Sequence, residues 1–205
     1  MKIKKRKVSD IQSVIMAALS LMTVVISVTI GLLLYNRYEM LIRQNDIKDT
    51  QNQMERLVNT VEQYLKDKYK GHEIIVVDTH SERLDRALAK YDIVNEMANG
   101  VDIQIDVLGI ARKQGKAKLF FIEAKKTKLT LRDLGQLWSY CKLVDPEEAF
   151  LLTSADLGSL RKLLVSFKRE DLLDFGDGKR IKKMQVGKWD VMKNTPEWSS
   201  LIPKM

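Results

Sequence analysis

The feature that most restricts this chain is a run of 26 consecutive uncharged residues, from Ile11 to Asn36, most of them Ile, Leu, Val, Met or Ala. An apolar helix needs about 20 residues to cross the hydrocarbon core of a bilayer, so this run can span it with some tilt. A buried core helix and a cleaved signal peptide are the alternatives. The run is longer than either usually is, and no small-x-small cleavage site follows it. The sequence therefore predicts a single transmembrane helix over residues 11–36, in contact with the lipid bilayer.

The charges on either side of the run predict its orientation. Residues 1–10 form a tail with five basic side chains and one acid, whereas the other flank carries Arg37 and Arg43 with Glu39 between them. The positive-inside rule favours such a tail in the cytoplasm and the rest of the chain outside the cell membrane, and a domain on the inner side stays open as the alternative. The net charge of +8 falls by half when the tail is removed, because 30 basic and 26 acidic residues remain. Overall basicity is therefore a poor indicator of nucleic-acid binding.

Composition excludes several classes of protein. The chain is 45% hydrophobic and 30% charged, so most of it can bury a core and disorder is not expected. A single cysteine, Cys141, excludes an internal disulfide and a cysteine-rich zinc site, and it lies on an apolar helical stripe that favours a core position over a nucleophile. Two histidines, His72 and His80, leave little room for a histidine-based metal centre, and Asp78-Thr-His80 is interpreted as a strand-end turn. No glycine-rich phosphate loop is present.

The region after the run predicts one long polar helix over residues 37–70. Apolar residues recur there every seven positions, at Met40, Ile47, Met54 and Val61. This is half of a heptad seam, which leaves open a homo-oligomer formed through the 37–70 helix. The second half of the helix carries an amphipathic stripe that is expected to pack on the domain, namely Met54, Leu57, Val58, Val61 and Leu65. We therefore expect a helical linker over residues 37–53 and a folded domain over residues 54–205.

The remaining patterns predict a mixed α/β domain. Strands are expected over residues 73–77, 101–110, 119–124 and 149–153, with a last strand or hairpin within 180–191. Helices are expected over 81–98, from the capping box at Thr130, and from Ser154. In the 101–110 strand, alternation places Val101, Ile103, Ile105 and Val107 on one face and Asp102, Gln104 and Asp106 on the other. The helix after Thr130 is expected to turn Leu134, Leu137, Trp138 and Cys141 inward.

Two of these strands carry acids on their polar faces. Asp106 lies on one, and Glu123 and Lys125 share a face at the end of the next. Carboxylates from neighbouring strands can converge on one divalent ion, and Mg²⁺ prefers such oxygen ligands. A bound metal ion of this kind suits phosphodiester hydrolysis. The alternative interpretation is a structural Glu–Lys pair at a strand end.

The acid-x-Lys pattern occurs three times in the chain, so its context matters. Asp46-Ile-Lys48 and Asp177-Gly-Lys179 do not follow a hydrophobic strand, whereas Glu123-Ala-Lys125 does. Residues 110–132 contain eight basic residues and Glu123 as their single acid. That local excess would attract a phosphate backbone, although a solvated turn would look similar. The nucleic-acid-binding candidates within it are Arg112, Lys126, Lys128 and Arg132.

Together these residues resemble the PD-(D/E)xK nuclease superfamily. The matching runs are Asp106-Val-Leu-Gly, Phe-Phe-Ile-Glu123-Ala-Lys125 and Gln136-Leu-Trp-Ser-Tyr140. The Gln-x-x-x-Tyr element is similar to that of the RecB-type branch, where it lies on a helix that approaches DNA. The resemblance covers roughly residues 55–155, and it implies a restriction-endonuclease-like mixed-sheet core flanked by helices. The residue before Asp106 is isoleucine rather than proline, and residues 71–100 have no counterpart in a minimal core.

The resemblance also implies roles. Asp106, Glu123 and the Ala124 carbonyl would bind Mg²⁺ or Mn²⁺, and Lys125 would orient the attacking water. The acid of the first helix best matches Glu62, with Glu55 and Glu96 as rivals, and Gln136 and Tyr140 would engage DNA. The expected function is thus a membrane-anchored, Mg²⁺-dependent deoxyribonuclease. The alternative is a non-catalytic, membrane-tethered DNA-binding module that uses the same basic face.

Overall fold

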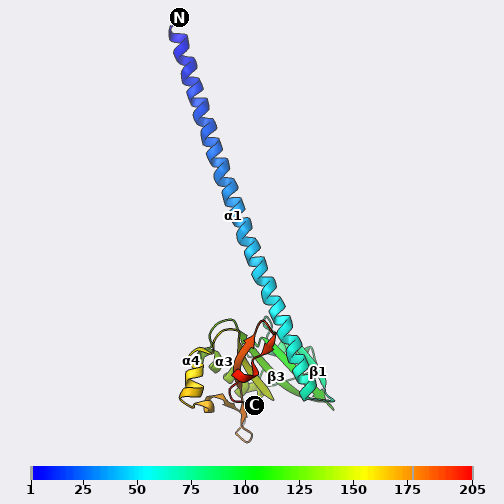
Figure 1. Ribbon diagram of the computed structural model, residues 1–205. Coiled ribbons are helices and arrows are strands. Elements are labelled where there is room, and N and C mark those ends of the chain that lie inside the picture. The colour runs from blue at the N-terminus through cyan, green and yellow to red at the C-terminus, as the bar shows by residue number, and fades with distance from the viewer. Residues whose placement is uncertain (1, 177, 205) are drawn as a thin grey trace. The chain divides into compact units, whose positions relative to one another are not determined.

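The computed structural model describes residues 2–176 and 178–204, and it describes no side chains before Ser13. The side chains of the basic tail and the acid of the Asp177-Gly-Lys179 pattern therefore lie outside the described part. The chain divides into two compact units, Met1–Gln51 and Asn52–Met205. One helix, α1 (Lys2–Lys68), contributes to both (Figure 1).

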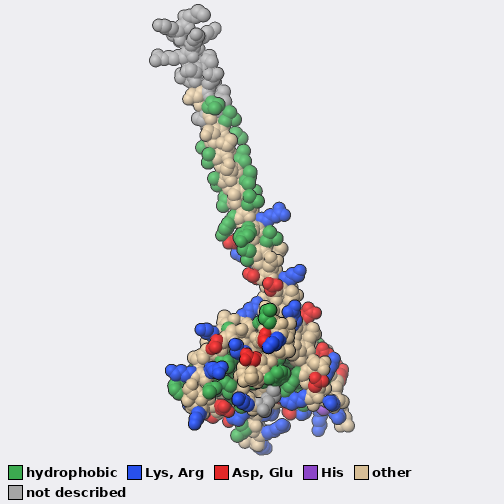
Figure 2. Space-filling model, in the orientation of Figure 1, with side chains coloured by type: hydrophobic (Ala, Val, Ile, Leu, Met, Phe, Trp, Pro, Cys, Tyr) green, Lys and Arg blue, Asp and Glu red, His purple; other side chains and the backbone are tan. Residues whose placement is uncertain are grey.

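The first unit is this single helix, and one stretch of it is long and apolar enough to cross a membrane. Figure 2 shows hydrophobic side chains covering the described part of that stretch, with charged side chains following it. Three of its hydroxyl groups bond to the helix itself: Thr23 Oγ1 donates to the Ser20 carbonyl at 2.7 Å, Ser27 Oγ to the Thr23 carbonyl at 2.8 Å, and Thr29 Oγ1 to the Val25 carbonyl at 2.8 Å. Such bonds satisfy polar groups without water, as a lipid environment requires.

The second unit is a mixed α/β fold, as its alternating helical and strand patterns predict. In the described residues, six strands form one sheet in the order β1-β2-β3-β4-β7-β8. The strands of this sheet are β1 (Glu73–Asp78), β2 (Val107–Lys113), β3 (Lys116–Lys125), β4 (Glu148–Thr153), β7 (Gln185–Asp190) and β8 (Thr195–Pro196). β2 is antiparallel to both of its neighbours, β1 and β3. β3, β4 and β7 run parallel, and β8 is antiparallel to β7. A separate hairpin joins β5 (Asp174–Phe175) to β6 (Lys182–Lys183).

Helices cover the sheet and connect its strands. They are α2 (Leu84–Ala89), α3 (Leu131–Val144), α4 (Gly158–Arg161) with the π-helix η1 (Lys162–Ser166), and the 3₁₀ helices η2 (Glu170–Leu173) and η3 (Trp198–Ser200). The apolar stripe at the end of α1 packs on one face of the sheet, where Leu57, Val61 and Leu65 join Phe120 and Ile122. The other face forms a second core with α2, α3 and α4. The two cores follow from the alternation of side chains along β3.

The strand directions bring the ends of β1, β3 and β4 and the start of β2 together at one end of the sheet, which is here called the acidic end. β2 starts there just after Asp106, and β1 ends there at Asp78, which pairs with Val107. β3 and the parallel β4 end there at Lys125 and Thr153, which pair with each other. Loops at this edge therefore carry the sequence motifs.

Three predicted elements are corrected. The strand expected from Val101 starts at Val107, since residues 102–105 belong to no strand ladder. The helix expected over 81–98 is the short α2 followed by turns, and Ser154 caps no helix because α4 begins at Gly158.

The predicted inner face of α3 also needs a correction. Leu134, Leu137 and Cys141 are buried, but Trp138 is 38% exposed and its Nε1 donates to the Asp174 carbonyl at 2.8 Å. The indole bonds the β5–β6 hairpin at the edge of the helix face, where its N–H finds a partner that the core does not offer.

Candidate active site

Asp106 lies at the point where the β2–β3 ladder stops. Val107 pairs with Ile122, so the Ala124 amide lies beyond the last paired residue of β2. Asp106 Oδ2 accepts a hydrogen bond from this amide at 2.8 Å. Ile105 packs in the core on the α3 side and Val107 in the core on the α1 side, so the predicted alternation breaks at Asp106. The aspartate thus replaces a ladder bond and fixes the start of β2 against the end of β3.

Glu123 is a buried charged group, with only 5% of its surface exposed. It follows Phe121 by two residues, and alternation along β3 therefore directs it to the face covered by α3. Its Oε1 accepts a hydrogen bond from Lys125 Nζ at 2.6 Å. Its Oε2 is buried without a hydrogen-bond partner. An orphaned carboxylate oxygen is costly in a protein interior, so this atom calls for a cation or a donor.

The electrostatics couple these three residues. Burial, and next the negative charge of Asp106, raises the pKa of Glu123 against the opposing effects of Lys125 and of a hydrogen bond from the Asp106 backbone. Burial also raises the pKa of Asp106, although the Ala124 amide and Lys125 oppose it. Burial by itself would lower the pKa of Lys125, but Glu123, Asp106 and Asp133 outweigh it and the pKa is raised. The pKa values of both carboxylates are raised although a protonated lysine lies beside them. The positive charge of one lysine therefore does not compensate for the burial of two carboxylates.

The first turn of α3 borders this site. The predicted capping box is present: the Asp133 amide donates to Thr130 Oγ1, and the Thr130 amide donates to Asp133 Oδ2 at 2.8 Å. The charge of Asp133 acts on Lys125, so this turn is close to the lysine. Gln136 lies about one turn further along α3 and Tyr140 about two turns further. Gln136 Nε2 donates a hydrogen bond to Tyr140 Oη at 3.2 Å. The two residues predicted to share a helical face are therefore in contact with each other.

The loop after Lys125 is held by the loop after β4. The Ser154 amide donates to the Lys125 carbonyl at 3.0 Å, and the buried Thr153 donates through Oγ1 to the Thr127 carbonyl at 2.7 Å. These bonds keep residues 126–130 at the acidic end of the sheet. Three of the basic candidates lie in this loop or at the start of α3, all with exposed side chains: Lys126, Lys128 and Arg132.

The structure does not bring Arg112 to this site. The ladder pairs Arg112 with Ala117 next to the β2–β3 turn, at the opposite end of the strands from Asp106. Its guanidinium donates to the Tyr91 carbonyl and lies 3.9 Å from a Glu73 carboxylate oxygen. Antiparallel pairing thus divides the basic stretch 110–132 between the two ends of the sheet.

Glu62 is not brought to the acidic end by any contact in the described residues. Its carboxylate pairs with Lys66 one turn along α1 at 2.6 Å. No group of three or more His, Cys, Asp or Glu side chains arranged around one point occurs in the described part of the chain. Asp106 and Glu123 therefore form a pair, without the third acid that the resemblance suggested.

Sequence reasoning interpreted Asp78 and His80 only as a turn, yet the structure places them beside Asp106. Asp78 ends β1 opposite Val107, and the Thr79 amide donates to the Asp106 carbonyl at 2.9 Å. His80 Nδ1 lies 2.6 Å from Asp78 Oδ1. An acid-x-His at a strand end was the available signal, but its meaning depended on the pairing of β1 with β2.

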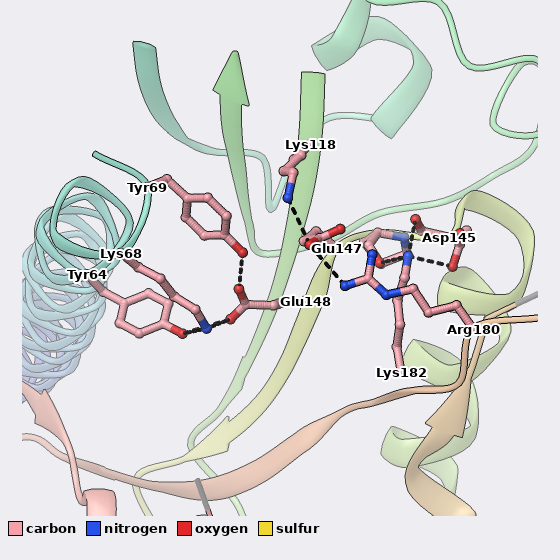
Figure 3. A network of polar contacts seen from close by, with 10 residues as sticks. Tyr64, Lys68, Tyr69, Lys118, Asp145, Glu147, Glu148, Arg180 and Lys182 are labelled. Carbon is pink, nitrogen blue, oxygen red and sulfur yellow. Dashed lines mark hydrogen bonds and ion pairs between the residues drawn. The ribbon is translucent and has the colours of Figure 1, made fainter. Parts of the chain in front are cut away.

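A second group of acids lies at the opposite end of β3 and β4 (Figure 3). Glu148, at the start of β4, accepts hydrogen bonds from Tyr64 at 2.7 Å, from Lys68 at 2.9 Å, and from Tyr69. Beside it, Glu147 accepts a hydrogen bond from Lys118 at 2.9 Å. Figure 3 shows the two tyrosines and Lys68 converging on Glu148 from the end of α1. This group attaches α1 to the sheet.

The donors at the acidic end fit a hard divalent cation. They are the carboxylate oxygens of Asp106 and Glu123, one of which is buried without a hydrogen-bond partner. The backbone carbonyl of Ala124, at the end of the same strand as Glu123, is a further oxygen ligand of the kind that such a cation prefers. Comparisons of the chain with protein-family models, with curated proteins and with solved structures found no match. The functional argument therefore depends on this geometry.

Proposed function

We propose that this protein is a metal-dependent nuclease that hydrolyses DNA phosphodiester bonds at the acidic end of its sheet. The orphaned Oε2 of Glu123 carries the proposal. A structural ion pair alone does not explain this carboxylate, because Lys125 bonds one oxygen of Glu123 and leaves the other buried without a partner, at 5% exposure beside a second carboxylate. A cation bound between Glu123 and Asp106 would satisfy that oxygen.

The architecture supports a restriction-endonuclease-like fold. The end of α1, three antiparallel strands, α3 and the parallel strand β4 follow in the order that the resemblance implies, with helices on both faces of a mixed sheet. Asp106 precedes the second strand, Glu123 and Lys125 end the third, and Gln136 and Tyr140 follow on a helix. This combination of order and position supports our proposal that the protein belongs to the PD-(D/E)xK superfamily.

Asp106, Glu123 and the Ala124 carbonyl would hold the ion, Mg²⁺ or Mn²⁺. When bound, it would polarise the phosphate and lower the pKa of a bound water. Lys125 remains protonated, since its pKa is raised, so it acts as a hydrogen-bond donor and not as a base. From beside Glu123 it would orient water or a phosphate oxygen. Lys128 and Arg132 would contact neighbouring phosphates, and Gln136 and Tyr140 would position the strand being cut.

The apolar helix over residues 11–36 is proposed as the membrane anchor of this nuclease. The charge asymmetry favours a domain outside the cell, where it could act on arriving DNA. Protease added to intact cells should then remove a C-terminal epitope tag. Protection of the tag until lysis would place the domain inside, without affecting the assignment of the chemistry.

The function is tested with the full-length chain in mild detergent, incubated with plasmid and with single-stranded DNA. We expect cleavage in Mg²⁺ or Mn²⁺, none in EDTA, and products with 5′-phosphates. Glu147→Gln is the matched control, because this acid also pairs with a lysine but lies at the other end of the sheet. Binding of DNA with no cleavage under any metal condition would instead favour the tethered DNA-binding module.

A further inference from the structure

A histidine flanks the proposed site on the side away from Lys125. Strand order places β1 on one side of β2 and β3 on the other. The segment after β1 carries His80, the segment before β2 carries Asp106, and the end of β3 carries Glu123 and Lys125. Strand order therefore places Asp106, at the start of β2, between the strand end that leads to His80 and the strand end that carries Glu123 and Lys125.

His80 is exposed, and its backbone is held by the buried Thr79 that precedes it. Thr79 is 2% exposed; its amide donates to the Asp106 carbonyl at 2.9 Å, and its Oγ1 donates to the Ile105 carbonyl at 2.5 Å. The backbone amide of His80 donates to Asp78 Oδ1 at 3.1 Å, and the ring Nδ1 lies 2.6 Å from the same oxygen. Residues 78–80 are thus hydrogen-bonded directly to the backbone of Ile105 and Asp106. The charge of His80 is also felt there, since it is one of the influences that lower the pKa of Asp106.

We propose that His80 is the catalytic acid of the nuclease, which protonates the leaving 3′-oxygen of the DNA, and that Asp78 is its positioning residue. The inference rests on the proposed function. In an in-line displacement the attacking water and the leaving oxygen lie on opposite sides of the phosphorus. If Lys125 orients water on the β3 side, the leaving oxygen faces the β1 side, where His80 lies.

The proton balance of this step is simple. Water attacks phosphorus, the bond from phosphorus to the 3′-oxygen breaks, and that oxygen takes a proton from His80 Nε2. The products are a 5′-phosphate and a 3′-hydroxyl. The proton released by the water passes to solvent, from which His80 is reprotonated. In this step Asp78 Oδ1, 2.6 Å from Nδ1, would accept the Nδ1–H, and Nε2 would be the ring atom that loses and regains the proton.

The test uses two substrates and the full-length chain. One is ordinary DNA, and the other carries a bridging 3′-phosphorothiolate, in which sulfur replaces the leaving oxygen and departs without needing a proton. We expect His80→Ala and His80→Gln to slow cleavage of ordinary DNA by about 10²–10⁴-fold, and to remain within about tenfold of the parent on the sulfur substrate. Asp78→Asn should show a smaller loss with the same recovery. Lys125→Ala should lose activity on both substrates.

The outcomes separate the two proposals. If His80→Ala loses as much on the sulfur substrate as on ordinary DNA, or if His80→Gln matches the parent, His80 is not the acid, while the nuclease assignment stands. If the parent cleaves neither substrate in Mg²⁺ or Mn²⁺, the proposed function fails, and the role of His80 fails with it. Thermal unfolding of each variant near the parent temperature shows that the losses do not come from misfolding, and Asp78→Asn provides the same comparison if His80→Ala does not fold.

Discussion

The two ends of the central strands each hold a carboxylate paired with a lysine, and the pairs differ in how completely they are satisfied. At one end, Glu148 accepts bonds from two tyrosines and a lysine, and Glu147 is paired with Lys118. At the other end, Glu123 is bonded to Lys125 through one oxygen only. The structural acids Glu147 and Glu148 are thus surrounded by donors, whereas Glu123 keeps one buried oxygen without a donor.

The pKa directions of two similar pairs express this difference. Burial acts to raise the pKa of Glu147, but Lys118, with Arg180 and Lys182, outweighs it and the pKa is lowered. Burial also raises the pKa of Glu123; there the second carboxylate, Asp106, adds to the rise, and Lys125 does not offset both. An acid–lysine contact therefore indicates a structural role only when the surrounding charges balance it.

The largest expected effect separates the two ends by activity. Asp106→Asn and Lys125→Ala should each lower the rate of plasmid cleavage by at least about 10³-fold, because residues that act as one unit fail together. Glu147→Gln should remain within a few-fold of the parent. Equal losses in all three variants would mean that the two ends are not functionally distinct.

Stability should show the opposite ranking. Glu148→Ala leaves the hydroxyls of Tyr64 and Tyr69 without their acceptor, and we expect the free energy of unfolding to fall by about 3 kcal/mol. Glu123→Gln removes a charge that burial and Asp106 disfavour, so the change should be within about 1 kcal/mol and could be a gain. Urea unfolding of the second unit, followed by tryptophan fluorescence, measures both. A large loss in Glu123→Gln would make Glu123 a structural residue.

The pH dependence of stability should also differ between the ends in the absence of metal. The folded pKa of Glu123 is raised above 4.5, so its contribution to stability is present below pH 4.5 and is lost as pH rises through the folded value. The folded pKa of Glu147 is lowered, so its contribution is present above pH 4.5 and is lost as pH falls. Glu123→Gln should therefore gain stability relative to the parent with rising pH, and Glu147→Gln should lose it. Unfolding in EDTA at several pH values tests these signs.

The smallest expected effect concerns the divided basic stretch. Lys128→Ala and Arg132→Ala should weaken DNA binding and lower the salt dependence of the affinity by about 1 in log–log slope for each residue. Lys113→Ala and Arg112→Ala, next to the β2–β3 turn, should leave that slope unchanged. Fluorescence anisotropy at several salt concentrations measures the slopes. A fall in slope at the turn would extend the DNA path to the second end of the sheet.

Sequence patterns were sufficient where the determinants are local. The alternation along β3 gave the shared face of Glu123 and Lys125, and the capping box gave the start of α3. They failed where strand pairing decides: Val101–Ile105 alternates like a strand, yet these residues have no ladder partner. The same limit hid the position of His80, since only the pairing of β1 with β2 brings it to Asp106.

Contacts between distant segments were equally out of reach. Glu148 finds its partners about 80 residues earlier, on and just after α1, and no local pattern relates them. Arg112 was assigned to the site because it is close to Glu123 in sequence, but the hairpin places it at the opposite end.

The central claim is that Glu123 and Asp106 form a cation site, and titration with Mn²⁺ followed by electron paramagnetic resonance tests it most directly. The full-length chain in detergent should bind Mn²⁺, and binding should be lost or strongly weakened in Glu123→Gln. Glu147→Gln should bind as the parent does, because its acid is already compensated by Lys118. Equal Mn²⁺ binding by Glu123→Gln and the parent would contradict the account.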